Sequence, residues 1–363
     1  GEIITIIEKI EKVIKNDNNK DKCISYLDKL KKSLLNSMES LNGFTKNYMN
    51  LIERIKKLSD DTEFIHLYDK KRQLFSIGYD MQEGSLTNSY YDLIASEARQ
   101  TSFIAIARGE VEEQHWFKLG RTLTQIDSYK GMVSWSGTMF EYLMPLLIMK
   151  TSKNTLMDET YSFAVRSQKK YGKQRNVPWG TSESGFYAFD IELNYQYKAF
   201  GVPWLGLKRG LVEDMVVAPY ATMLAMQVDP VASIKNLKRL EREGANGPYG
   251  FYEALDYTPE RLPIGEKRGI VKSYMAHHQG MSLLSLNNCL NDNIMQTRFH
   301  TDPVVEAAKL LLQEKVPANI VFTKENKEKV IPFKDIAYTE EDSHREYKEP
   351  NLILPRVHIM SNG

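Results

Sequence analysis

The sequence has little of several features that mark particular classes of protein. It holds only two cysteines among 363 residues, Cys23 and Cys289, which stand far apart and outside any metal-binding spacing. Two such thiols form no disulfide framework, and they favour a reducing compartment. The longest apolar stretch, residues 143–149, is too short to span a bilayer and is interrupted by Pro145. No signal peptide is recognisable, so we expect the chain to be soluble.

An excess of charge is also missing, since 48 basic residues stand against 47 acidic residues. This balance gives no reason to expect nucleic acid as a partner. No phosphate-binding glycine loop, serine nucleophile elbow or Rossmann fingerprint occurs. His277 and His278 are adjacent, and neighbours on a helix diverge by about 100°, so they cannot easily share one ion. We therefore expect no metal site and no cofactor.

The sequence is rich in helical periodicity. Residues 2–58 are amphipathic, with isoleucines and leucines at helical spacing. Asp229 and Asp302 each precede a proline, which places a capping carboxylate before a residue suited to the first helical position. Further helices are predicted at about 89–108, 112–120, 136–150, 158–172, 210–227 and 268–290, with short extended pieces at 75–80, 186–193 and 318–334. Helices joined by unequal loops, without regular alternation with strands, indicate an all-α toroid or solenoid.

Aromatic residues are unevenly placed. All four tryptophans lie between positions 116 and 204, and tyrosine and phenylalanine crowd into 187–200 and 249–257. Core packing explains most aromatic side chains, but these clusters fall in segments rich in glycine and proline, which read as long ordered loops. Sugar-binding sites use aromatic faces as platforms, because the C–H face of a pyranose is apolar.

Two glutamates are candidates for acid–base chemistry. Glu183 lies in a tight loop between small residues, four positions after Trp179, and a nearby aromatic can raise a carboxyl pKa by desolvation. The alternative for Glu183 is a carboxylate that caps a helix or binds backbone amides. Glu97 lies between alanines on the predicted 89–108 helix, and Arg99 is not on the same face. Its alternative is a buried salt bridge.

Other carboxylates stand among aromatics and glycines. Glu141 follows Trp135 and Gly137, and Glu253 and Asp256 lie in the string Gly250–Tyr257. Carboxylates in such surroundings are suited to binding sugar hydroxyls, and they could equally orient the loops that carry them.

The sequence also contains ten longer motif strings. They are FSIGY at 75–79, SYYDL at 89–93, SEAR at 96–99, VSWSG at 133–137, FEYLMP at 140–145, VPWG at 177–180, SES at 182–184, GLKRG at 206–210, GFYEA at 250–254 and YMAHHQGM at 274–281. In order and rough spacing they resemble the glycoamylase-like domain of cyclic β-1,2-glucan synthases. The resemblance runs from about residue 63 to residue 334.

The resemblance implies an (α/α)6 barrel and a cyclising role inside a large membrane-anchored synthase. Residues 61–334 would be the catalytic domain, 1–60 a helical segment packing on it, and 335–363 a C-terminal extension or linker. The implied partners are a β-1,2-glucan chain and the glycosyltransferase and phosphorylase-like parts of the synthase. The implied location is the cytoplasmic side of the inner membrane. A chain that starts at Gly1, without methionine, agrees with a piece of a longer protein.

The resemblance also implies a retaining transglycosylase, which needs a nucleophile and an acid/base. On this chain the acid/base falls on Glu183 and the nucleophile on Glu97. Candidates for the groove walls are Trp135, Trp179, Tyr249, Phe251 and Tyr252, and candidates for binding hydroxyls are Arg99, Glu141, Gln196, Glu253 and His278. Two other functions stay open: an inverting endo-β-1,2-glucanase with water as acceptor, and a non-catalytic glucan-binding domain of the synthase.

Overall fold

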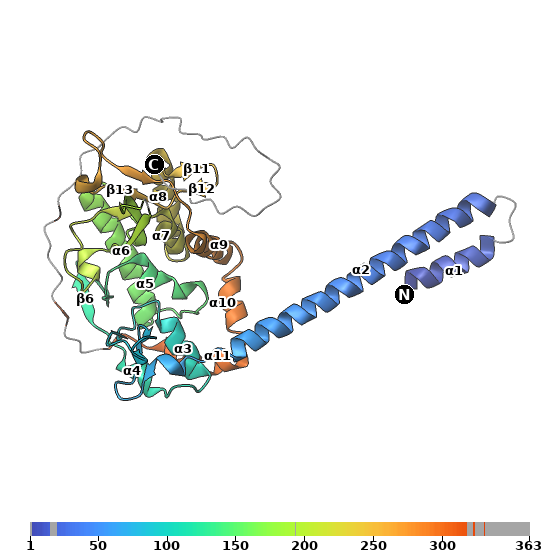
Figure 1. Ribbon diagram of the computed structural model, residues 1–363, viewed down its shortest axis with the longest axis horizontal. Coiled ribbons are helices and arrows are strands. Elements are labelled where there is room, and N and C mark those ends of the chain that lie inside the picture. The colour runs from blue at the N-terminus through green and yellow to red at the C-terminus, as the bar shows by residue number, and fades with distance from the viewer. Residues whose placement is uncertain (1, 15–19, 193, 318–321, 324–329, 331–363) are drawn as a thin grey trace. The chain divides into compact units, whose positions relative to one another are not determined.

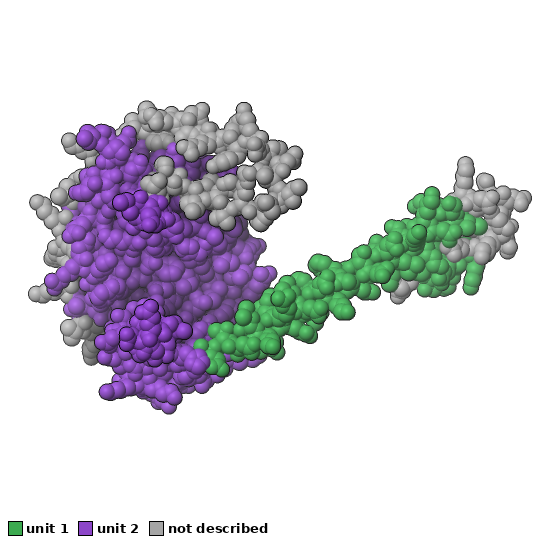
Figure 2. Space-filling view, viewed as in Figure 1, with its two compact units in different colours: residues 1–63 green, residues 64–363 purple. Residues whose placement is uncertain are grey.

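The computed structural model describes residues 2–14, 20–192, 194–317, 322–323 and 330. The chain divides into two compact units, Gly1–Glu63 and Phe64–Gly363 (Figure 2). The predicted C-terminal extension at 335–363 lies outside the described residues, as does most of the extended piece expected at 318–334. Within the described residues, no helix combines the length and the apolar character needed to cross a membrane.

The first unit is a pair of helices, α1 (Glu2–Ile14) and α2 (Lys20–Asp60), which pack together (Figure 1). The apolar positions of α1 recur every three to four residues, so they share one face, and Ile7 on that face is buried. Lys31 Nζ of α2 donates to Glu8 Oε1 of α1 at 2.9 Å. The helical pattern predicted for 2–58 is thus confirmed. The predicted packing of this segment on the catalytic part stays a prediction.

The second unit contains both helices and strands. Its helices are α3 (Arg99–Ala107), α4 (Gln114–Lys118), α5 (Met139–Leu143), α6 (Leu156–Arg175), α7 (Pro219–Leu224), α8 (Pro230–Arg242), α9 (Ala276–Leu290), α10 (Ile294–Phe299) and α11 (Pro303–Ala307). Within the described part of this unit there are also six 3-10 helices: η1 (Ile65–Leu67), η2 (Pro145–Leu147), η3 (Pro203–Leu205), η4 (Ala225–Gln227), η5 (Pro259–Arg261) and η6 (Lys309–Gln313). In Figure 1, α5, α6 and α7 lie together in the middle of this unit, and α5 packs against both others.

The strands form small antiparallel sheets. One sheet has the order β1 (Tyr68–Asp69), β2 (Leu74–Ser76), β5 (Tyr90–Tyr91), and another has β10 (Val216–Val217), β13 (Ala254–Asp256), β14 (Gly269–Val271). The residues that the structure describes also form four two-stranded pairs: β3 (Tyr79–Asp80) with β4 (Ser85–Leu86), β6 (Leu123–Ile126) with β7 (Tyr129–Met132), β8 (Glu183–Phe189) with β9 (Tyr195–Ala199), and β11 (Asn246–Gly247) with β12 (Gly250–Phe251).

The prediction of an all-α fold is therefore wrong, and the described residues do not show an (α/α)6 barrel. The error has a physical cause in the segments that were interpreted as loops. Residues 183–199 contain glycine and many aromatics, yet their backbone groups pair across the β8–β9 hairpin. Glycine and aromatic clusters are compatible with short twisted strands as well as with loops, and only long-range pairing distinguishes them.

Three of the predicted helices begin much later than expected. The helix predicted from residue 210 begins at Pro219, because Val216 and Val217 form β10. The helix predicted from residue 89 begins at Arg99, because β5 pairs with β2 at Tyr90 and Tyr91. The helix predicted from residue 268 begins at Ala276, because 269–271 form β14. The two Asp-Pro caps are confirmed, since Asp229 and Asp302 accept hydrogen bonds from backbone amides of α8 and α11.

Candidate active site

Glu183 is the first residue of β8, and neighbours on α5 and α7 hold its backbone. It pairs with Ala199 of β9. The Tyr220 hydroxyl of α7 donates to the Glu183 carbonyl at 2.8 Å. The adjacent Ser182 Oγ accepts from the Phe140 amide at 3.0 Å and lies 2.8 Å from the Tyr220 hydroxyl. The start of β8 is thereby tied to two helices, so the Glu183 carboxyl is presented from a rigid support.

The surroundings of Glu183 favour its neutral form. Burial raises the pKa of Glu183 to about 7, the negative charges of Glu97 and Glu141 add to the rise, and Lys208 opposes it. Desolvation and like charges both disfavour the ionised carboxylate. A carboxyl that titrates near neutral pH can donate a proton and take one back, as a general acid/base must.

Glu97 lies in a turn immediately before α3, and its predicted place on a helix is wrong. Its carboxylate accepts from Ser96 Oγ at 3.2 Å, and Ser96 Oγ itself accepts from the Ala98 amide at 3.2 Å. Among the described residues, Glu97 takes part in no ion pair within 4 Å. The half-buried carboxylate is therefore left with few protein partners, as expected of a group that meets a substrate.

Arg99 lies in the core and does not face an open site. Its guanidinium, 2% exposed, donates to the carbonyls of Ile94 and Tyr142 at 2.9 and 3.3 Å and to the Tyr161 hydroxyl at 3.1 Å. These three bonds join the segment before Glu97 to α5 and α6. The side chain therefore holds the Glu97 turn in place.

Glu141 organises the loop at 134–138 that precedes α5. Its two carboxylate oxygens accept from Ser134 Oγ, the Ser136 amide, and both the amide and the hydroxyl of Thr138, all at 2.8 to 2.9 Å. Thr138 and Glu141 also form a capping box at the start of α5. Burial raises the pKa of Glu141, while these donors lower it. The carboxylate is thus occupied by the protein, and its charge acts on Glu183.

The two candidate tryptophans of the wall differ in exposure. Trp135 is 60% exposed, and its carbonyl accepts from the Lys208 amide at 2.9 Å. Trp179 is only 9% exposed and belongs to the main core. The Asn236 side chain bonds both the amide and the carbonyl of Trp179, at 3.1 and 2.6 Å. Trp135 is available to a sugar face, whereas Trp179 packs inside the unit.

A second polar cluster lies beside β8. The Glu253 carboxylate accepts from the Gly185 amide at 3.0 Å and lies 2.9 Å from His278 Nδ1. His278 Nε2 lies 3.3 Å from the Tyr197 hydroxyl of β9, and the His278 ring stacks on Tyr220 with centroids 3.7 Å apart. Glu253 and His278 are 2% and 1% exposed. The structure therefore joins two predicted site residues, far apart in sequence, through a buried hydrogen bond.

A cavity of about 160 Å³ borders this cluster. Phe251 and Tyr252 line it together with Glu253, His278 and residues of α7 and α9. Tyr252 also contacts the ring of Tyr274. Two aromatic walls beside polar groups match the composition of a sugar-binding pocket.

Two further predicted residues are placed away from these bonds. Gln196 Nε2 donates to the carbonyls of Asn194 and Tyr195 at the end of the β8–β9 hairpin. Tyr249 is 71% exposed, and its amide donates to the Tyr274 hydroxyl at 3.4 Å. Among the described residues, neither side chain is hydrogen-bonded to Glu183, so each stays a candidate for a more distant part of a groove.

Sequence reasoning missed Tyr197, Tyr220 and Lys208. Lys208 lies in the GLKRG string, and a cation between two glycines could have marked it as a candidate site residue. Tyr197 shares a face of β9 with Tyr195 and Ala199, but that alternation is visible only once the segment is known to be a strand. Tyr220 carried no sequence signal, because its role comes from contacts with distant segments.

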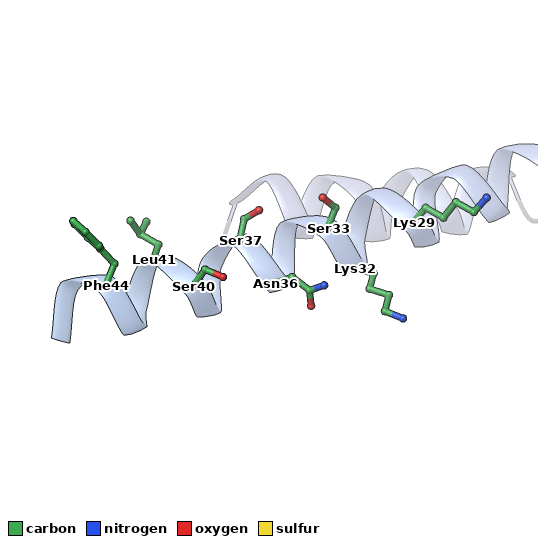
Figure 3. Close-up of a pocket in the computed structure, with 8 residues that line it drawn as sticks. All are labelled: Lys29, Lys32, Ser33, Asn36, Ser37, Ser40, Leu41 and Phe44. Carbon is green, nitrogen blue, oxygen red and sulfur yellow. The ribbon is translucent and has the colours of Figure 1, made fainter. Parts of the chain in front are cut away.

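A hollow in the first unit offers no comparable chemistry. Its lining residues lie on α2 and carry no acid: Lys29, Lys32, Ser33, Asn36, Ser37, Ser40, Leu41 and Phe44. Figure 3 shows these side chains spread along one helix rather than gathered round a point. In neither unit do the described residues bring together three side chains of the metal-binding types.

Comparison with known proteins identifies the family. Residues 89–303 match the Glycoamylase family, described as "Putative glucoamylase". The chain belongs to this family. It is also 45% identical over 281 residues to the cyclic beta-(1,2)-glucan synthase NdvB of Rhizobium meliloti (strain 1021), which confirms the resemblance indicated by the motifs. That match covers 77% of this chain and 10% of the relative, so the chain spans about a tenth of the relative's length.

Two solved structures share the fold of this Glycoamylase family member. A "putative glucoamylase" from Bacteroides fragilis NCTC 9343 aligns with a TM-score of 0.53 and 18% identity, over 73% of this chain and 64% of its own. A "putative glucoamylase" from Bacteroides caccae ATCC 43185 aligns with a TM-score of 0.51 and 17% identity, over 72% and 64%. At such identities the likeness concerns the fold alone.

Proposed function

We propose that this Glycoamylase family member is a retaining transglycosylase, which cleaves linear β-1,2-glucan and closes it into cyclic β-1,2-glucan. One arrangement supports the chemistry: the partly buried Glu183 carboxyl lies near Glu97 and Glu141, and burial together with their charges raises its pKa to about 7. The substrate class rests on the motif strings and on the 45% identity to a cyclic beta-(1,2)-glucan synthase.

In this proposal Glu183 acts first as the acid. It protonates the glycosidic oxygen while a Glu97 carboxylate oxygen attacks the anomeric carbon, so the C–O bond to the leaving sugar breaks as a glycosyl ester forms. Glu183, now ionised, accepts the proton of a hydroxyl at the non-reducing end of the same chain. That hydroxyl oxygen then displaces Glu97 from the anomeric carbon. Two inversions return the β configuration and close the ring.

The groove for a curved glucan would use the residues that the structure leaves accessible. Trp135 would stack on a sugar near Glu183, and Phe251, Tyr252 and Tyr249 would extend the aromatic wall. Gln196 would bind hydroxyls at one end. Arg99 and Glu141 would act through the turn and the loop that they hold, because protein groups already occupy their side-chain polar atoms. Trp179 would act through its packing in the core.

The parent protein would supply the other activities. Because the relative is about ten times longer than the matched region, we place this chain between a glycosyltransferase part and a phosphorylase-like part of a synthase. We place that synthase at the inner membrane, with this domain on the cytoplasmic side.

The test incubates the protein with linear β-1,2-glucan and then treats the products with an exo-acting β-glucosidase. We expect resistant rings from the wild type and none from Glu183→Gln or Glu97→Gln. Glu192→Gln, an exposed glutamate in the β8–β9 connection, should cyclise normally. A β-linked ring made from a β-linked chain would itself establish retention.

Other outcomes would replace the proposal. Shorter linear sugars without rings would indicate a hydrolase, and the anomer that forms first would distinguish inversion from retention. Glucan that is bound but unchanged would indicate a non-catalytic binding domain.

A further inference from the structure

For a neutral His278 ring, the hydrogen bonds of Tyr197, His278 and Glu253 can be assigned in one direction. An ionised carboxylate only accepts, so Glu253 takes one bond from the Gly185 amide and one from His278 Nδ1–H. A neutral imidazole with its proton on Nδ1 has a lone pair on Nε2. The Tyr197 hydroxyl, 3.3 Å away, then donates its single proton to His278. Stacking on Tyr220 prevents the ring from turning out of this arrangement.

The β8–β9 hairpin sets Tyr197 near Glu183. Glu183 pairs with Ala199 and Gly185 pairs with Tyr197. Side chains two residues apart on a strand point to the same face, so Glu183 and Tyr197 are diagonal neighbours on one face. Gly185, opposite Tyr197, has no side chain, and a Cβ there would lie 3.4 Å from Glu253 Cγ. The β8 strand therefore lets Glu253 approach close to Tyr197.

The Tyr197 phenol also keeps its proton. Burial and the negative charges of Glu183 and Glu253 raise the pKa of Tyr197 far above its ordinary value. A protonated phenol whose hydrogen is committed to one partner still has lone pairs on its oxygen. Tyr197 as a residue is 41% exposed, so part of it is open to an incoming ligand although its hydroxyl is partly desolvated.

We propose that the Glu253–His278 pair commits the Tyr197 proton and so makes the Tyr197 oxygen an obligate acceptor for a glucan hydroxyl beside Glu183. Tyr197 is then a specificity-determining ligand, and Glu253 and His278 are positioning residues. This inference rests on the proposed function. It differs from the sequence-based assignment, in which Glu253 and His278 themselves bind hydroxyls, because both are buried and bonded to protein groups.

A double-mutant cycle tests the inference on the whole chain with linear β-1,2-glucan. Tyr197→Phe removes the acceptor and should lower kcat/KM about tenfold, the value of one lost hydrogen bond. Glu253→Gln turns an amide NH2 toward His278 Nδ1, which moves the ring proton to Nε2. His278 then donates to the Tyr197 oxygen and competes with the glucan, so a similar loss is expected.

The double variant Tyr197→Phe/Glu253→Gln distinguishes an effect of Glu253 through Tyr197 from a merely structural role of Glu253. If Glu253 acts through Tyr197, the double variant should lose no more activity than Tyr197→Phe alone. Losses that multiply would refute the inference. Tyr195→Phe, on the same strand and face and 51% exposed, should keep wild-type kcat/KM. Nitrogen-15 NMR of histidine should show Nδ1–H at His278 in the wild type and Nε2–H in Glu253→Gln.

Each remaining outcome has a defined meaning. Wild-type protein that leaves the glucan unchanged would refute the proposed function and, with it, the acceptor role. An active wild type with a fully active Tyr197→Phe would refute the inference alone. If Glu253→Gln does not fold, the wild-type spectrum still decides, since a doubly protonated or Nε2–H ring at His278 contradicts the committed proton.

Discussion

Replacing Glu183 by glutamine should stabilise the protein above neutral pH. Burial, with the charges of Glu97 and Glu141, raises the pKa of Glu183 to about 7 from an ordinary 4.5. The folded protein therefore binds this proton more tightly than the unfolded chain does. Glutamine has nearly the same shape and carries no charge, so it avoids the cost of holding an anion in this site.

The sign and size of the effect follow from proton linkage. Below pH 4.5 the carboxyl is protonated in both states, and Glu183 costs nothing. Between pH 4.5 and 7 the unfolded chain loses the proton first, so wild-type stability falls as the pH rises. Above pH 7 the cost is complete and amounts to about 3 kcal/mol, at 1.4 kcal/mol for each tenfold change. We expect Glu183→Gln to exceed the wild type by up to that amount at pH 8 and to equal it at pH 4.

Urea denaturation followed by tryptophan fluorescence measures this difference. All four tryptophans lie in the second unit, so the signal reports the unit that contains Glu183. Glu192→Gln serves as the control, because that side chain is exposed and should leave the pH dependence unchanged. A free-energy difference between Glu183→Gln and wild type that stays constant from pH 4 to pH 8 would refute the desolvation of Glu183.

Three further predictions concern the support of the site. Glu141→Gln should destabilise the protein by about 1–3 kcal/mol in urea denaturation. The glutamine side chain has only one oxygen, so it would leave one of the two buried backbone amides of the loop unpaired. An unchanged free energy of unfolding would contradict the role given to the Glu141 carboxylate. Gly201→Ala should abolish the cooperative thermal transition, since a Cβ there would lie 1.7 Å from a carbonyl oxygen of the 134–138 loop. At Gly280 an added Cβ would meet nothing within 4 Å, so Gly280→Ala should leave Tm unchanged or higher. Trp179→Ala should lower the free energy of unfolding by about 3–5 kcal/mol. Trp135→Ala should keep the wild-type stability and weaken glucan binding in calorimetry. Loss of stability in Trp135→Ala, or of binding alone in Trp179→Ala, would contradict the core role of Trp179 and the sugar-binding role of Trp135.

Local signals in the sequence were enough for the family and the helix caps, and they singled out Glu183 as a candidate acid. The Asp-Pro pairs predicted helix starts at 229 and 302 because a cap depends on residues within one turn. The N-terminal helices followed from a repeat within a single segment. Glu183 stood out because its small neighbours and a nearby tryptophan are adjacent in the chain. The long motif strings indicated the family for the same reason, since each is contiguous.

Long-range contacts set the strands and the roles of most site residues. Gly185 is 68 residues from the carboxylate that binds its amide, and Glu253 is 25 residues from its histidine. Such partners leave no periodic trace, because each depends on how distant segments pair and pack. Arg99 and Trp179 looked like ligands from their neighbours in sequence, yet both lie in the core. Their burial is a property of the folded second unit, in which most buried polar groups find a partner wherever the chain brings one.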